Sequence, residues 1–85
     1  MGVDATKAIA NRLARVEGQI RGVRGMIEGG RPCEEIVDQL SACHAALESA
    51  TKAALLHYFE ECLVEVEDPG AALERVADLV MKTRF

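Results

Sequence analysis

The sequence predicts an all-α protein built from three helices. Its apolar residues recur every three or four positions, the spacing of one helix face. The only two prolines, Pro32 and Pro69, each follow a turn signal, and aromatic residues make up only 4% of the 85 residues. A chain of this length forms one domain with a limited core. We therefore expect a single domain over residues 1–85, with helices at about 5–28, 32–66 and 69–82.

The first helix, residues 5–28, is expected to begin after Asp4, whose carboxylate suits an N-cap. Apolar side chains then follow at intervals of 4, 3, 4, 3 and 4 residues, which is typical of a helix in a bundle. These residues are Ile9, Leu13, Val16, Ile20, Val23 and Ile27. The pair Gly29-Gly30 ends the helix, because glycine readily adopts the conformation that follows a helix C-terminus.

The second helix is expected to run unbroken from Pro32 to about Val66, without internal glycine or proline. At 1.5 Å per residue it would be roughly 50 Å long. A compact chain of this size is only about 30 Å across. One chain therefore cannot bury the apolar face of this helix, and we expect a homo-oligomer, most simply with two-fold symmetry. The third helix, residues 69–82, has one apolar stripe of Leu73, Val76 and Val80.

The net charge of −4 is unevenly distributed along the chain. Residues 1–31 hold six basic against three acidic residues, whereas residues 32–85 hold four basic against eleven acidic ones. A basic first third suits an anionic partner, although a solvated helix face would give the same pattern. No apolar stretch approaches the roughly 20 residues of a membrane span, and the first residues lack the apolar core of a signal peptide. We expect a cytoplasmic protein without a membrane partner.

The three cysteines, Cys33, Cys43 and Cys62, are an odd number, which favours metal or redox chemistry over structural disulfides. Cys33 and Cys62 lie 29 residues apart on the second helix, on the same face but about 43 Å apart along its axis. In an antiparallel pair of such helices crossing near Leu47 and Glu48, Cys33 of one subunit would approach Cys62 of the other. The alternative is that both are ordinary buried cysteines.

The other candidate ligands are less favourable. Cys43 is expected to be a core cysteine, and His57 points away from Cys62. His44 is expected to pack, to face solvent or to contact DNA. Tyr58 lies one turn before Cys62 on its face, where a third ligand would be expected. No CxxC motif, glycine-rich loop or base paired with a nucleophile indicates catalysis, so the chain is not expected to be an enzyme.

The segment from Arg12 to Ala42, RLARVEGQIRGVRGMIEGGRPCEEIVDQLSA, resembles the signature of the copper-sensing operon repressor family, the CsoR/RcnR/FrmR group. The resemblance extends through Cys62 and covers most of the chain. It implies an antiparallel four-helix-bundle dimer that assembles into a homotetramer, a dimer of dimers. It also implies a transcriptional repressor that binds operator double-stranded DNA and releases it when an inducer occupies the cysteine site between subunits.

The resemblance also implies which residues contact DNA. The basic positions of the family fall on Arg12 and Arg15 in the first helix and on Lys52 in the second, and Gln19 belongs to the same signature. Cationic groups at these positions would neutralise phosphates, which makes binding depend steeply on salt.

The inducer implied by the resemblance depends on Tyr58. Copper-sensing members have a histidine four residues before the second cysteine, where this chain has Tyr58. Two thiols without a nitrogen ligand resemble the persulfide-sensing, CstR-like branch. The expected function is therefore a repressor derepressed by persulfide or polysulfide crosslinking of Cys33 and Cys62 across the dimer interface, with no cofactor required. The alternative is copper(I) as a metal bound by the same two cysteines, and a remote alternative is a thiol redox or metal-storage protein that does not bind DNA.

Overall fold

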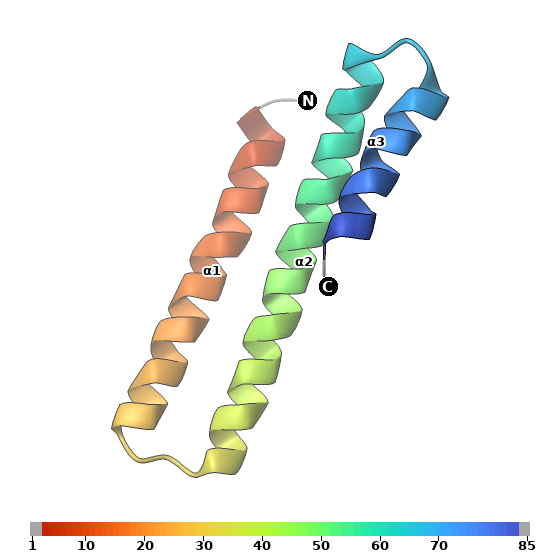
Figure 1. Ribbon diagram of the computed structural model, residues 1–85. Helices are drawn as coiled ribbons and strands as arrows, with labels where there is room; N and C mark the ends of the chain where they lie inside the picture. Colours follow the sequence, from red (N-terminus) through yellow and green to blue (C-terminus); the bar gives the residue numbers. More distant parts are fainter. Residues whose placement is uncertain (1–2, 84–85) are drawn as a thin grey trace.

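The computed structural model describes residues 3–83, which contain three helices and no strand. Helices α1 (Val3–Glu28) and α2 (Cys33–Glu65) form a long antiparallel hairpin, and α3 (Pro69–Lys82) folds back along the C-terminal half of α2 (Figure 1). Within the described residues α3 contacts α2 but not α1, so α2 is the central helix. The prediction of an all-α, three-helix fold is confirmed.

The turn between α1 and α2 depends on glycine. Gly30 has φ +71°, in the left-handed region that other residues rarely adopt. The Arg31 N–H then donates to the Met26 carbonyl oxygen at 3.0 Å, the hydrogen bond of a Schellman motif. The glycine stop expected at this position therefore has a specific conformational cause.

The starts of the helices differ in how they are capped. The prediction of Asp4 as an N-cap is wrong, because α1 already includes Val3 and places Asp4 in its first turn. A carboxylate there still favours the helix electrostatically. At the start of α3, by contrast, the Asp68 side chain accepts a hydrogen bond from the Gly70 N–H at 3.0 Å.

The core between α1 and α2 contains few buried residues. Val16 and Val23 of α1 are buried, as are Cys43 and Ala50 of α2, and each pair is separated by seven residues, or two helical turns. This spacing keeps each pair on the face of its helix that meets the other helix. Cys62 of α2 and Ala72 of α3 are the other buried apolar residues of the described chain.

A second apolar stripe on α1 stays exposed among the described residues. Leu13, Ile20 and Ile27, also seven residues apart, are 41%, 53% and 56% exposed. The sequence pattern predicted one continuous seam; the structure instead divides it into a buried stripe and an exposed one. On α2, the exposed apolar side chains include Val37, Leu40, Leu47, Leu56 and Leu63.

The molecule is flat and elongated. It measures 55 × 27 × 12 Å and has a radius of gyration of 16.8 Å, against about 12 Å for a compact chain of this length. An exposed apolar stripe on α1 and further exposed apolar side chains on α2, in a single layer of helices, are typical of a subunit that is completed by other chains. None of the helices over residues 3–83 has the length and apolarity to cross a membrane.

Candidate functional site

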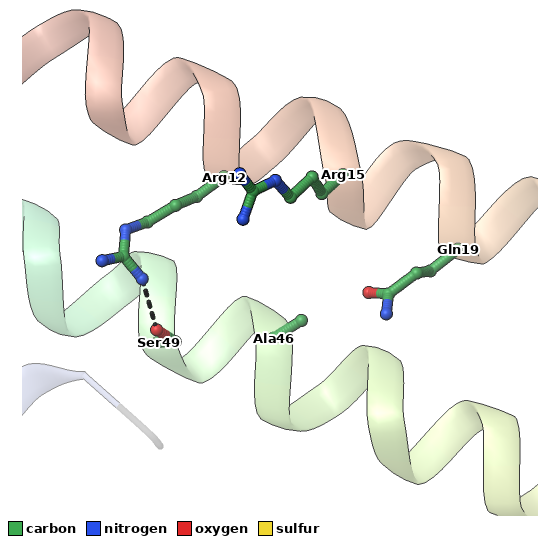
Figure 2. Close-up of a pocket in the computed structure, with 5 residues that line it drawn as sticks. All are labelled: Arg12, Arg15, Gln19, Ala46 and Ser49. Atoms are coloured by element: carbon green, nitrogen blue, oxygen red, sulfur yellow. Dashed lines mark hydrogen bonds between the residues drawn. The ribbon is translucent and has the colours of Figure 1, made fainter.

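Three of the four residues expected to contact DNA lie in one cleft between α1 and α2. Arg12, Arg15 and Gln19 extend from α1, and Ser49 and Ala46 of α2 form the facing wall (Figure 2). The cleft has a volume of about 270 Å³. The Arg12 guanidinium donates a hydrogen bond from Nη1 to the Ser49 hydroxyl oxygen at 2.8 Å, which links the two helices.

The two arginines of this cleft have no acidic partner among the described residues, a property they share with Lys7, Arg21 and Lys82. Four basic residues form ion pairs with a nearby acid: Arg24 with Glu28 at 3.5 Å, Arg31 with Glu35 at 2.6 Å, Lys52 with Glu48 at 3.1 Å and Arg75 with Glu65 at 3.0 Å. Among residues 3–83, neither Arg12 nor Arg15 has a carboxylate within 4.0 Å. Their guanidinium groups are therefore available to an anion from outside the chain, and guanidinium matches the geometry of phosphate.

Lys52 lies outside the cleft. Its ammonium group pairs with Glu48 on the preceding turn of α2. Ser49, which the sequence reasoning missed, occupies the wall instead. The signal that could have found it is the hairpin register, since the turn at residues 29–32 places Arg12 opposite Ser49.

Cys33 and Cys62 lie in different surroundings at the two ends of α2. Cys33 is exposed at the first residue of the helix, whereas Cys62 is 1% exposed beneath α3. The continuous helix between them keeps the two sulfurs about 43 Å apart. Within the described residues, no three His, Cys, Asp or Glu side chains are grouped closely enough to hold a metal ion. One chain alone therefore does not form the two-cysteine site.

The Cys62 thiol has two polar neighbours, Tyr58 and Arg75. A hydrogen bond with Cys62, reinforced by the negative charge of its thiolate form and by burial, raises the pKa of Tyr58 above its ordinary value. Arg75 reaches Cys62 from α3, and its hydrogen bonds with Cys62 and Glu65 raise the pKa of its guanidinium. Tyr58 was expected near Cys62 from helical spacing. Arg75 was missed, because only the packing of α3 on α2 places it there.

The remaining thiol and imidazoles lie apart from these two groups. Cys43 is 7% exposed in the core between α1 and α2, as expected for a core cysteine. His44 is exposed. The Nε2 atom of His57 pairs with Oε1 of Glu61 at a distance of 2.8 Å. The buried Nδ1 atom of His57 has no hydrogen-bond partner among residues 3–83.

Comparison with known proteins places this arrangement in a family. The family model described as "Metal-sensitive transcriptional repressor" matches residues 5–82. The chain belongs to this family. The prediction of CsoR/RcnR membership is therefore confirmed.

Relatives in this family include named copper sensors. The chain is 33% identical over 72 residues to the copper-sensing transcriptional repressor CsoR of Bacillus subtilis, a match that covers 85% of this chain and 71% of that protein. It is 38% identical over 61 residues to the copper-sensing transcriptional repressor RicR of Mycobacterium tuberculosis, which covers 72% of this chain and 64% of RicR.

Solved structures that are similar to this chain have the same fold. The copper-sensing repressor CsoR with Cu(I) from Geobacillus thermodenitrificans has a TM-score of 0.76 and 29% identity, and the match covers 96% of this chain and 88% of that one. The nickel-responsive transcriptional regulator InrS also has a TM-score of 0.76 and 29% identity, covering 89% of each chain. Members of one fold thus respond to different metals, and the inducer must be argued from the residues of the individual chain.

Proposed function

We propose that this protein is a DNA-binding transcriptional repressor that leaves its operator when copper(I) binds between Cys33 of one subunit and Cys62 of another. The observation that carries this proposal is that one unbroken helix holds both thiols about 43 Å apart, so that only a neighbouring chain can bring them together. The copper-sensing relatives favour copper over the persulfide expected from the sequence.

The exposed apolar face of α2 that includes Val37, Leu40 and Leu47 supports an oligomer of the required kind. Leu47 lies near the midpoint between Cys33 and Cys62 and is 46% exposed. A two-fold axis near Leu47 would pair two α2 helices in antiparallel fashion and bury that face. The same symmetry would create two equivalent dithiol sites.

The cleft of α1 supports the DNA partner. Arg12 and Arg15 have no acidic partner among the described residues, whereas Arg24 and Arg31 of the same chain are paired. Two unpaired guanidinium groups beside each other repel unless an anion neutralises them. A DNA phosphate would supply that charge, and Gln19 and Ser49 would add hydrogen-bonding groups around it.

The donor atoms fit copper(I) better than nickel. Thiolates are soft ligands that select copper(I), which accepts coordination by two sulfurs, whereas a nickel site would draw on nitrogen donors. Neither histidine of the chain adjoins Cys62: His57 is engaged with Glu61, and His44 is more than four turns away along α2. Cys33 and Cys62 would hold the metal, which when bound would link two subunits and change their relative arrangement.

A persulfide is the second candidate inducer, and Tyr58 favours it. At the position one turn before Cys62, this chain has a phenol in place of a nitrogen ligand, and interaction with Cys62 raises the pKa of that phenol. In this chemistry a thiolate attacks the sulfane sulfur of a persulfide, and the second thiol resolves the product to a polysulfide crosslink between subunits. Repression of transcription is the activity in the names of the relatives, and it favours both candidates over a thiol enzyme or a storage protein.

One pair of titrations distinguishes the candidates. Reduced protein bound to DNA is titrated with copper(I) held by a strong chelator, without oxygen, and separately with a small-molecule persulfide donor. If copper is the inducer, DNA is released at one copper(I) per subunit, and persulfide causes no comparable release. Release by persulfide together with crosslinked dimers in the intact mass would instead establish the second candidate.

Two variants serve as controls for this titration. Cys33→Ala and Cys62→Ala should each bind DNA but fail to release it, because each removes half of the intersubunit site. Cys43→Ala removes a thiol outside this site and should respond like the unmodified protein. If neither inducer releases DNA, or if both single variants still respond, the proposal is wrong.

A further inference from the structure

A second cleft opens between α2 and α3, beside the buried thiol of Cys62. Its volume is about 270 Å³, close to the lower limit of about 300 Å³ for small-molecule sites. Its lining consists of Tyr58, Arg75, Asp78, Leu79 and Lys82. Tyr58 lies one helical turn before Cys62 on α2, and the pKa values of Tyr58 and Arg75 are both raised by interaction with Cys62, so a molecule in this cleft would lie near that thiol.

The polar groups of this cleft match a carboxylate that has an N–H group beside it. Arg75 and Lys82 supply cations, and the Tyr58 hydroxyl oxygen supplies a hydrogen-bond acceptor for the N–H group. The Arg75 guanidinium already pairs with Glu65, but the side chain is 47% exposed and its other N–H groups can bind a second carboxylate. Asp78 repels anions and accepts hydrogen bonds, which favours a ligand with one carboxylate and a nearby N–H over a polyanion.

We propose that the cleft binds an amino-acid or short-peptide thiol compound, whose carboxylate contacts Arg75 and Lys82 and whose sulfur carries the inducer to Cys62. The inference rests on the proposed function only in taking Cys62 as a sensing thiol. It applies to both inducers, since a small thiol can hold copper(I) as a thiolate complex or sulfane sulfur as a persulfide. The size and charge of the cleft restrict the carrier to a small molecule with a single carboxylate near its sulfur.

For a persulfide carrier RS–SH, the transfer is balanced without another reactant. The Cys62 thiolate attacks the terminal sulfur, a new S–S bond forms on Cys62, and the RS–SH bond breaks. The carrier leaves as the thiolate RS⁻ and takes a proton from water, and Cys62 becomes a persulfide. Because Cys62 is 1% exposed, the side chains that cover it must move aside for this step, and a carboxylate that draws Arg75 toward the cleft would assist that movement.

The test compares two persulfides that differ in one group. The persulfide of N-acetylcysteine has a carboxylate, and the persulfide of N-acetylcysteine amide has a neutral amide of nearly the same size. The rate of sulfur addition to each is measured by intact mass on Cys33→Ala protein, which reports Cys62, and on Cys62→Ala protein, which reports the exposed Cys33. The ratio of the carboxylate rate to the amide rate cancels differences in thiol reactivity.

We expect this ratio to be at least five times larger at Cys62 than at Cys33. In the Cys33→Ala protein, Lys82→Gln should bring the ratio at Cys62 close to that at Cys33. Lys7→Gln, which removes the same charge from an exposed position outside the cleft, should leave it unchanged. Lys82 is the last residue of α3 and is exposed, so its replacement preserves the fold, which circular dichroism checks.

Equal ratios at the two thiols would overturn the inference, and so would a high ratio at Cys62 that survives Lys82→Gln. These rates are measured without DNA or copper, so a failure of the proposed function would not alter them. Conversely, if the protein releases DNA with copper(I) but shows equal ratios at the two thiols, the proposed function stands and only the carrier site is refuted.

Discussion

The substitution of Arg15 by glutamine tests the DNA-binding cleft most directly. Arg15 is exposed on α1, lines the cleft, and has no acidic partner among residues 3–83. Each phosphate contact contributes about 0.9 to the slope of log K against log salt concentration. A pair of symmetric subunits loses two contacts, so we expect the slope to become shallower by about 1.8. Between 50 and 200 mM salt, the variant should therefore lose about 12-fold less affinity than the unmodified protein.

Arg24→Gln is the matched control for this prediction. It removes the same charge from an exposed position of the same helix, but its guanidinium pairs with Glu28 at 3.5 Å and lies outside the cleft. Fluorescence anisotropy with a labelled duplex, selected by the protein from a random-sequence pool, gives both slopes. The reasoning is refuted if Arg24→Gln changes the slope as much as Arg15→Gln, because the effect would then come from net charge and not from the cleft.

Further predictions concern the thiol environment, assembly and stability. Tyr58 is the only tyrosine and tryptophan is absent, so the absorbance of the phenolate at about 295 nm reports this residue alone. In a pH titration, the midpoint of this absorbance should lie above the ordinary pKa of about 10, and it should fall toward that value in Cys62→Ala. Because this pKa is raised on folding, the stabilisation that comes from Tyr58 should be present below pH 10 and lost as the pH rises through the pKa of the folded state. Chemical denaturation at several pH values measures this loss. An unshifted midpoint would contradict the interaction between Tyr58 and Cys62. Leu47→Glu should convert the oligomer to monomers, because it places a charge at the centre of the exposed face of α2. Light scattering measures the mass of the assembly, and an unchanged mass would exclude that face from the interface. Asp68→Ala should lower the unfolding free energy by about 1 kcal/mol through loss of the α3 cap, whereas an unchanged value would mean that the Gly70 N–H is equally satisfied by water.

Features that follow from spacing along one helix were predicted from the sequence. The three helices follow from apolar periodicity and from the two prolines, and the proximity of Tyr58 to Cys62 follows from their separation by four residues. Each of these depends on backbone geometry that is nearly constant.

Features that depend on contacts between helices were not predicted. Ser49 and Arg75 reach the sites only through the register of the hairpin and the docking of α3, which many side chains determine together. The division of the α1 stripe has the same origin: Val16 and Ile20 follow one pattern in the sequence, but a single neighbouring helix covers only the first. A periodic pattern identifies a face without stating how many neighbours cover it.

The thin core has a consequence for the life of the protein in the cell. A newly synthesised chain that has not met a second copy keeps Leu13, Ile20, Leu47 and other apolar side chains in water, with six residues of the described chain buried. We expect such a lone chain to be marginally stable and readily opened, and proteases and chaperones act on opened chains. Since assembly stabilises the folded state in proportion to the logarithm of concentration, we expect a minimum copy number below which the protein is degraded faster than it accumulates.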